Sequence, residues 1–432
     1  MDWKEYYHSH MATAAEAVGR IRSGDRVVLE HACGEPVYLV DKLVENAAAY
    51  RDVEIVHMVA MGKGAYCLPE NAGHFRHNSL FVGSSTRKAV ESGQGDFTPC
   101  FFFEIPRLFR TNLPVDVALI SVTPPNAEGK VSLGVSCDYT LEAVKTAKTV
   151  IAQVNPSMPY TFGGTELPVE EIDLFVEHDE PVIELPQGRI GETEKAIGRN
   201  CATLIPDGAT LQLGIGAIPD AVLLFLKDKK DLGIHSEMFS DGVVELAEAG
   251  VITNAKKTLK PGKFVVTFLM GTKRLYDFVN NNPSVEMQPV DYVNNPYVIA
   301  RNDNLISINS CVQIDLMGQV ASESVGLKQI SGTGGQVDFV RGASASKGGV
   351  SIMAFPSTAA KGAVSKIVPF LDHGSAVTTC RCDVDYAVTE YGVAHLKGET
   401  LRTRARNLIA IAHPDFRAPL IEEFEKRFHC TF

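Results

Sequence analysis

The chain has 432 residues, of which 45% are hydrophobic and 22% are charged, as in ordinary folded globular proteins. Its formal net charge of −11 argues against nucleic acid as a partner, because binding to phosphate requires a basic surface. The longest apolar runs, such as 264–270, are far shorter than the roughly 20 residues of a membrane-spanning helix, so we expect no membrane partner. The length favours two domains.

The nine cysteines are scattered along the chain, and none forms a CxxC pair. Cys380 and Cys382 are spaced as CxC, without the second pair that a zinc site would need. This pattern indicates reduced thiols, and residues 1–18 are too polar and too mixed in charge for a signal peptide. We therefore expect a cytoplasmic protein that binds no metal.

The first predicted helix covers 13–21, where Thr13 and Glu16 have the spacing of a capping box. The region 23–50 then has the pattern of a turn, a strand, a turn with glycine and proline, and a helix. The same order recurs at 207–226, which is predicted as a turn, a buried strand, a glycine-rich turn and a helix.

Two further stretches match in the same order along the chain, because 57–63 resembles 267–273 and 116–122 resembles 304–309. Ordered matches of this kind favour a duplicated α/β unit. The spacing between the copies grows by roughly 25 residues after the first match. We expect these extra residues to include Glu237, as an arm that the first copy lacks.

The segment 179–191 contains two prolines and two glycines and is predicted to be a linker, followed by a helix at 192–201. We therefore expect two domains, 1–185 and 186–432. The alternation of β-rich runs with helices favours two open, mostly parallel α/β sheets of similar fold. In such sheets ligands bind beyond the carboxyl ends of strands, where Gly214 is predicted to lie.

The remaining elements follow in the second half of the chain. They are a glycine-rich loop at 332–342, strands at 349–355 and 386–389, an Arg-rich helix from about Leu401, and a charged helix over 419–428. The simplest interpretation of the Arg-rich stretch is a solvated helix face.

The turn Gly214-Ile215-Gly216 separates a predicted strand from a predicted helix, so its backbone N–H groups can approach a negatively charged oxygen. It is not a Walker A loop, because no Gly-Lys-Ser/Thr follows. It is not a dinucleotide fingerprint either, because Pro219 occupies the place of the last glycine of GxGxxG. A tight turn that binds nothing is the alternative interpretation.

The candidate nucleophile is Glu237. His235-Ser236-Glu237 has the HxE form of zinc deaminases, but the PCxxC that they require does not follow. No GxSxG elbow is present either, which argues against a serine hydrolase. A carboxylate nucleophile then becomes the most economical chemistry. The alternative is that Glu237 is a surface residue or a helix cap.

Five stretches together resemble the acetyl-CoA hydrolase/transferase family of CoA-transferases, and the resemblance covers essentially the whole chain. They are GIGAIPDAV, HSEMFSDGVVEL, FLMGTKRLYDF, SGTGGQVDFVRGA and VTEYGVAHLKG. The resemblance implies two α/β domains of similar fold, with Glu237 as the nucleophile. It also implies an oxyanion- and CoA-binding role for the two glycine-rich loops, at Gly214, Ile215, Gly216, Gly334 and Gly335. Asn309, Met270 and Gly271 are further candidates for the substrate pocket, with polar strand ends as the alternative.

The activity that the resemblance implies is transfer of CoA between acetyl-CoA and a short-chain carboxylate, with 4-hydroxybutyrate as the expected acid. The implied mechanism is ping-pong, with coenzyme A as a substrate and neither metal nor ATP, and a homodimer or homotetramer is expected. Two enzymatic alternatives remain open, butyryl-CoA:acetate transfer and acyl-CoA hydrolysis. A third is a non-catalytic protein that binds CoA or senses sugar phosphates.

Overall fold

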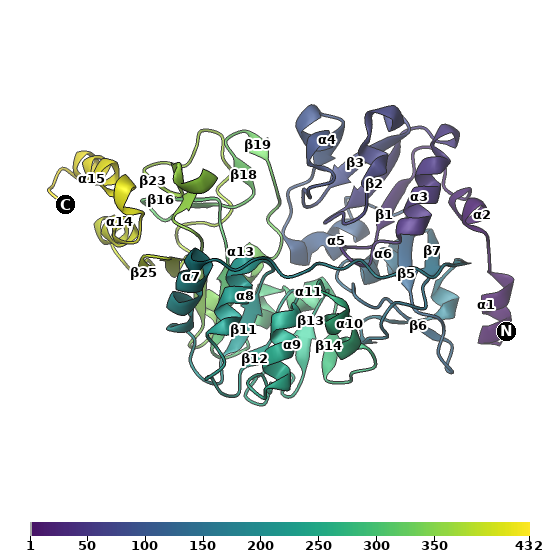
Figure 1. Cartoon of the computed structure of the whole chain (residues 1–432). Helices are drawn as coiled ribbons and strands as arrows, with labels where there is room; N and C mark the ends of the chain where they lie inside the picture. Colours follow the sequence, from purple (N-terminus) through teal and green to yellow (C-terminus); the bar gives the residue numbers. More distant parts are fainter. Residues whose placement is uncertain (1) are drawn as a thin grey trace. The chain divides into compact units, whose positions relative to one another are not determined.

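The computed structural model describes residues 2–432, which divide into two compact units (Figure 1). The first unit holds the chain up to Leu185 together with Val265–Val293, and the second holds Pro186–Phe264 and Asn294–Phe432. The second unit is therefore interrupted, whereas the sequence predicts a continuous domain over 186–432.

The segment Val265–Val293 belongs to the first unit because its strands pair there. A three-stranded sheet has the order β13 (Phe264–Val266), β14 (Val285–Met287) and β8 (Phe162–Gly163), and β14 pairs in parallel with β8. Hydrogen bonds between backbone groups thus tie this segment to the first half of the chain, a pairing that no local sequence pattern announces.

The main sheet of the first unit has seven strands, and every adjacent pair in it is parallel. In spatial order the strands are β10 (Leu174–Glu177), β7 (Thr149–Val154), β5 (Val117–Val122), β1 (Arg26–Leu29), β2 (Val53–His57), β3 (Phe75–Ser79) and β4 (Gly95–Phe97). All six residues of β5 are buried, as expected for a parallel strand covered on both faces. Helix α3 (Val37–Glu45) contributes Leu39 and Leu43 to the same core as Val27.

The main sheet of the second unit has six strands and is parallel except at its last pair. In spatial order the strands are β12 (Gly233–Ile234), β11 (Thr210–Leu213), β15 (Leu305–Asn309), β20 (Val350–Ala354), β24 (Tyr386–Thr389) and β25 (Gly392–His395). The C-terminal helices α14 (Leu401–Ala410) and α15 (Pro414–Phe428), yellow in Figure 1, add Leu408 and Phe424 to its core.

The two sheets share one strand order, which confirms the predicted duplication. The series β10-β7-β5-β1-β2 of the first unit is matched by β24-β20-β15-β11-β12 of the second. The predicted fold class, two open and mostly parallel α/β domains of similar fold, is confirmed at the same time.

The position of Glu237 within the repeat differs from the prediction. Ile234 of β12 pairs with Leu211 as Ile55 of β2 pairs with Val27, so β12 is the counterpart of β2. Glu237 stands three residues after Ile234, and Met58 stands three residues after Ile55, so the two occupy equivalent positions. The prediction that Glu237 lies in an inserted arm was therefore wrong. It rested on the match of 57–63 to 267–273, and these two segments belong to the same unit rather than to two copies.

Local predictions hold where short-range hydrogen bonds decide the structure. The Thr13 hydroxyl accepts from Glu16 N at 3.3 Å, and the Glu16 carboxylate accepts from Thr13 N at 2.9 Å, which confirms the capping box of α2 (Ala14–Val18). Helix α7 (Glu192–Ala202) also starts as predicted. Helix α15 begins at Pro414 rather than at Pro419, because His413 caps it and proline is tolerated in a first turn.

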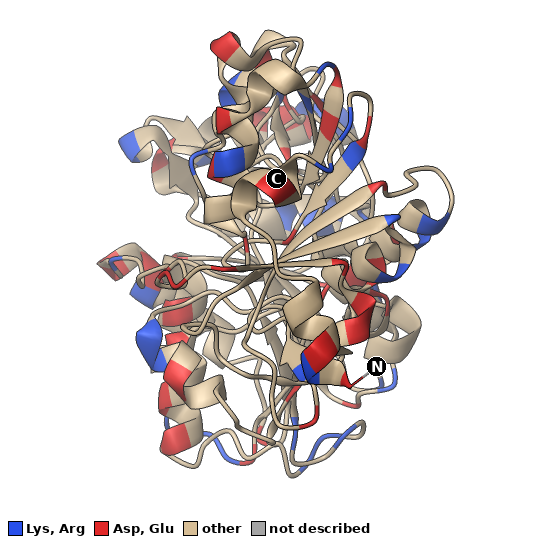
Figure 2. Ribbon diagram, turned by 90° about the vertical axis from the view of Figure 1, so that its right-hand side faces the viewer, with Lys and Arg blue, Asp and Glu red and all other residues tan. Residues whose placement is uncertain are grey.

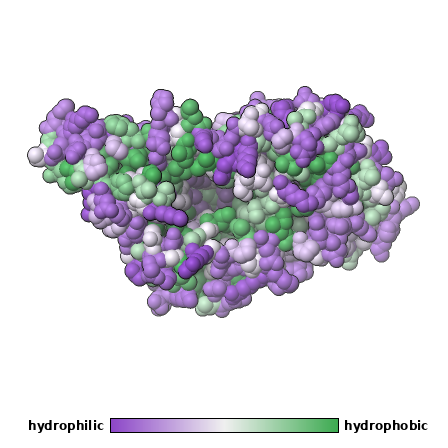
Figure 3. Space-filling model, turned by 45° about the horizontal axis from the view of Figure 1, so that its top comes forward, coloured by the Kyte–Doolittle hydropathy of each residue, from purple (hydrophilic) through white to green (hydrophobic). Residues whose placement is uncertain are grey.

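The surface carries charges of both signs. Lys and Arg lie interspersed with Asp and Glu along the ribbon in the view of Figure 2, without a continuous basic stretch. In Figure 3 the hydrophobic residues of the visible face form separate patches among hydrophilic ones. Among residues 2–432, no helix combines the length and the apolar character needed to span a bilayer.

The turn between β1 and α3 contains a buried carboxyl group. Glu35 is 4% exposed and accepts hydrogen bonds from Met61 N at 3.0 Å and Gly62 N at 2.7 Å. A Cβ at Gly62 would overlap this carboxyl group, so a larger residue there would displace it. Burial raises the pKa of Glu35 to about 7.

This raised pKa predicts a pH-dependent stability. Between pH 4.5 and 7, Glu35 is ionised in the unfolded chain and protonated in the folded protein, so folding takes up a proton. The free energy of unfolding should therefore fall with rising pH, by about 1.4 kcal/mol per pH unit from this group. We expect Glu35→Gln to gain stability relative to the wild type across that window, as measured by urea unfolding. Exposed Glu70→Gln is the control, and a pH-independent difference for Glu35→Gln would contradict the prediction.

Candidate active site

Glu237 lies just beyond the carboxyl end of β12, in a short segment fixed to the neighbouring strand. His235 N donates to Leu211 O at 3.2 Å, and Met238 forms an antiparallel bridge with Leu213. The Ser236 hydroxyl is 3.2 Å from both Leu213 N and Leu213 O. Ser236 and Met238 are buried, whereas Glu237 between them is partly exposed, as expected for side chains that alternate along an extended chain.

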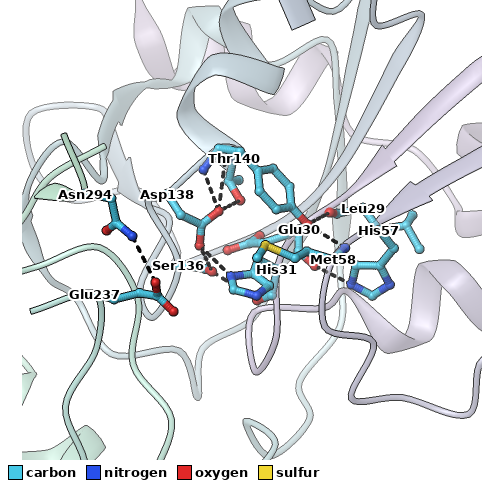
Figure 4. A network of polar contacts seen from close by, with 11 residues as sticks. Leu29, Glu30, His31, His57, Met58, Ser136, Asp138, Thr140, Glu237 and Asn294 are labelled. Carbon is cyan, nitrogen blue, oxygen red and sulfur yellow. Dashed lines mark hydrogen bonds and ion pairs between the residues drawn. The ribbon is translucent and has the colours of Figure 1, made fainter. Parts of the chain in front are cut away.

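Asn294 holds the Glu237 carboxylate. Its Nδ2 donates to Glu237 Oε2 at 2.9 Å, as drawn in Figure 4. Asn294 is fully buried, and its Oδ1 has no hydrogen-bond partner among residues 2–432. A hydrogen bond to a charged acceptor is stronger than a neutral one. The sequence did not indicate this residue, because a single asparagine 57 positions from Glu237 forms no motif.

Gly335 completes the immediate surroundings of Glu237. It is the N-cap of α13 (Gln336–Ala345). A Cβ at this position would overlap both Glu237 Oε2 and Asn294 Nδ2, so a larger residue here would displace these two side chains. The N-terminus of a ten-residue helix thus lies against a carboxylate, an arrangement in which the helix dipole favours negative charge. Gly334, the preceding residue, has a φ of +53°, in the left-handed region.

The turn 214–216 follows β11 directly. It begins next to Leu213, the residue that Ser236 and Met238 contact. Gly216 has a φ of +106° and caps α8 (Ala217–Leu224). A Cβ added at Gly214 or Gly216 would meet no atom within 4 Å, and Ile215 is 45% exposed. The turn is therefore open rather than packed against other segments.

The three other candidate residues lie in different surroundings. Asn309 ends β15, where its Nδ2 donates to Gln212 Oε1 at 3.1 Å and its Oδ1 accepts from Gln212 Nε2 at 3.3 Å. These two strands flank the point at which the strand order reverses, where open α/β sheets bind ligands. Met270 and Gly271 belong to the first unit, whereas Glu237 belongs to the second.

The first unit contains a buried polar network at the corresponding strand ends. His31 Nδ1 lies 3.0 Å from Asp138 Oδ2, and the same carboxylate accepts from the Ser136 hydroxyl at 2.7 Å (Figure 4). Glu30, directly after β1, accepts from Ser121 N of β5. Burial raises the pKa of Glu30 well above its usual value and lowers that of His57. The chain's own carboxyl groups thus fill this region.

No three His, Cys, Asp or Glu side chains within residues 2–432 are grouped so that they could hold a metal ion. The residues around Glu237 therefore provide a carboxylate, an amide donor, a helix N-terminus and an open glycine turn. Such a set can stabilise a carboxylate nucleophile and the oxyanion that its attack on a carbonyl produces.

Residues 1–185 match the acetyl-CoA hydrolase/transferase N-terminal domain, and residues 271–424 match the C-terminal domain of that family. The chain is 65% identical to 4-hydroxybutyrate coenzyme A transferase of Clostridium kluyveri, over 99% of this chain and 100% of that protein. It is 45% identical to succinyl-CoA:cyclohexane-1-carboxylate CoA transferase of Geobacter metallireducens, over 97% and 96%.

Among solved structures, 4-hydroxybutyrate CoA-transferase from Porphyromonas gingivalis is 46% identical and matches with a TM-score of 0.86, covering 99% of this chain and 100% of that one. The likeness extends over both units. The chain belongs to the acetyl-CoA hydrolase/transferase family.

Proposed function

We propose that the protein is a CoA-transferase that moves CoA between acetyl-CoA and a short-chain carboxylate, with 4-hydroxybutyrate as the acid. The observation that carries this proposal is the Glu237 carboxylate, partly exposed at a strand end and bonded by buried Asn294 against Gly335. The choice of acid is supported by the relatives from Clostridium kluyveri and Porphyromonas gingivalis.

The reaction proceeds by a ping-pong mechanism. The Glu237 carboxylate attacks the thioester carbonyl of acetyl-CoA, and the C–S bond breaks to release CoA thiolate and leave an acetyl-glutamyl anhydride. The thiolate then attacks the glutamyl carbonyl, which gives an enzyme–CoA thioester and free acetate. The incoming carboxylate repeats these steps in reverse order and leaves as its CoA ester.

Each intermediate keeps the free energy of the thioester, so the transfer needs neither ATP nor a metal, with coenzyme A as a substrate rather than a cofactor. Its main requirement is that water is kept from the anhydride. The tetrahedral intermediates carry an oxyanion, for which we assign the backbone N–H groups near Ile215 and Gly335. Loss of one such donor typically costs about 3 kcal/mol, roughly a hundredfold in rate. Gly214, Gly216 and Gly334 allow these backbones to approach the substrate.

Two related activities use the same residues. Butyryl-CoA:acetate transfer differs only in the acid that the pocket accepts, and acyl-CoA hydrolysis differs in admitting water to the glutamyl intermediates. A non-catalytic CoA-binding protein is disfavoured, because a carboxylate beside an anionic ligand weakens binding without a compensating role. We further propose a cytoplasmic homodimer or homotetramer.

An acceptor panel tests the substrate assignment. With acetyl-CoA as donor, we expect kcat/KM to be highest for 4-hydroxybutyrate among acetate, butyrate, 4-hydroxybutyrate and succinate, with CoA ester formation followed by chromatography. A higher value for butyrate would favour the butyryl-CoA alternative. Release of free thiol without any acid, at a rate equal to that of transfer, would favour the hydrolase.

Substitution of Glu237 tests the nucleophile. We expect Glu237→Ala to abolish transfer while leaving the fold intact, because the side chain is partly exposed. Glu237→Asp should be severely impaired, since a shorter side chain withdraws the carboxylate from the acyl carbonyl. Full acyl exchange by the alanine variant would refute the assignment.

Borohydride trapping locates the covalent step. After addition of acetyl-CoA without an acid acceptor, borohydride should reduce the glutamyl thioester, inactivate the enzyme and change the mass of the peptide that contains Glu237. Modification of a different peptide would show that another residue is the nucleophile.

The close approach of Gly335 to Glu237 predicts that Gly335→Ala loses activity. The added methyl group must displace the carboxylate or the helix terminus, so we expect kcat to fall roughly a hundredfold or more. Gly95→Ala is the matched control, because a Cβ there meets its nearest atom at an ordinary 3.4 Å. Equal kcat values for the two variants would show that the contact is unimportant.

Asn294 is expected to act by positioning and stabilising the Glu237 carboxylate. Loss of a hydrogen bond to a charged group costs about 1.5–3 kcal/mol, so Asn294→Ala should lower kcat roughly 10- to 100-fold with a smaller effect on KM. Asn294→Asp places a second carboxyl group beside the first and should move the acidic limb of the kcat profile to higher pH. Identical pH profiles for the two variants would contradict this role.

A further inference from the structure

The thiols of Cys380 and Cys382 take no part in the proposed reaction, and they differ from the other cysteines. Both are exposed, whereas the other seven, all within residues 2–432, are buried or partly buried. Burial raises the pKa of Cys33 to about 11 and those of Cys67 and Cys201 to about 12. Because the thiolate is the reactive form, chemical modification should be directed to the exposed pair.

The two thiols lie in one tight turn. Asp383 N donates to Cys380 O at 2.9 Å, so 380–383 form a β-turn with the cysteines at its first and third positions. Residues two apart have Cα atoms separated by at most about 7 Å, and a turn brings them closer. A disulfide requires a separation of about 4.4–6.8 Å. The turn therefore places the two cysteines at a Cα separation compatible with a bridge, and closing the bridge requires the turn to change its conformation.

The turn is anchored at its centre. Arg404 of α14 is 7% exposed, and its Nη1 donates to Arg381 O at 2.6 Å. The carbonyl between the two cysteines is thus held by a buried guanidinium group. A bridge that twists the turn must either break this bond or transmit the change to the residues beside it.

The residue before the turn connects it to the candidate active site. Thr379 pairs with Val320 through two backbone hydrogen bonds of 3.1 Å, and its hydroxyl accepts from Gln336 Nε2 at 3.0 Å. Gln336 is the first residue of α13 and directly follows Gly335. The Cα of Gly335 in turn lies so close to the Glu237 carboxylate that a Cβ would overlap it. A shift of Thr379 therefore acts on the helix end that confines the nucleophile.

We propose that Cys380 and Cys382 form a modification site for low-molecular-weight disulfides, and that the internal disulfide so formed lowers transfer activity. One thiolate attacks a sulfur of the small disulfide, forms a mixed disulfide and expels one small thiolate. The second cysteine thiolate attacks the protein sulfur of that bond and expels the other. The two cysteines lose two electrons and two protons, and the small disulfide becomes two thiols. The effect on transfer rests on the proposed function, whereas the formation of the disulfide does not.

Treatment of the full-length enzyme with oxidised glutathione tests the site. Trypsin cleaves after Arg381, between the two cysteines, and yields peptides 367–381 and 382–397. After oxidation these two peptides should remain joined as the main disulfide-containing species, and after dithiothreitol they should separate. Transfer activity should fall roughly tenfold or more with the linkage and return on reduction.

Variants identify which thiols are responsible. Cys380→Ser/Cys382→Ser should keep its activity under oxidised glutathione, whereas Cys430→Ser, which removes a partly buried thiol, should respond as the wild type does. Cys382→Ser alone should carry one glutathione on Cys380.

Absence of the joined peptides, or full activity when they are joined, would overturn the proposal, as would equal inhibition of the double variant. Failure of the reduced wild type to transfer CoA would refute the proposed function and leave the peptide readout intact.

Discussion

The candidate site depends on the absence of a side chain at position 335. A Cβ there would overlap both the Glu237 carboxylate and the Asn294 amide, so the observed arrangement of three residues from distant parts of the chain depends on a glycine. The result is a carboxylate that is hydrogen-bonded on one side, lies at a helix N-terminus and stays partly exposed. Hydrogen bonding and the helix dipole both favour the ionised form, which is the form that a nucleophile requires.

The duplication explains how one scaffold produces two different strand ends. Directly after β1 stands Glu30, which is buried and accepts a hydrogen bond from Ser121 of the neighbouring strand. Directly after β11 stands Gly214, with open space around its Cα. The carboxyl group that closes the region in the first unit is thus absent from the second. Beyond the next strand the carboxyl group is found in the second unit instead, where Glu237 occupies the position that Met58 has in the first.

Local patterns in the sequence predicted much of the fold, because backbone propensity and capping act over a few residues. The capping box at Thr13, the buried strand predicted within 207–226 and the helix from Glu192 are all present in the structure. The duplication of an α/β unit was predicted as well. Pairing between distant segments was not, since hydrogen bonds between strands leave no local periodicity. For that reason the sequence indicated neither the packing of 265–293 with the first unit nor the position of Glu237 at a strand end that both units share.

By itself, the sequence determined the fold class, the family resemblance and the choice of Glu237 as the candidate nucleophile, because ordered motifs carry that information along the chain. Only the tertiary structure decided which groups surround that carboxylate. Asn294 had no sequence signal. Nothing in the sequence distinguished Gly335 from the other glycines of its loop, whereas the structure places it against Glu237. The physical reason is that close packing and hydrogen bonding act between atoms that are near in space, whatever their separation in the chain.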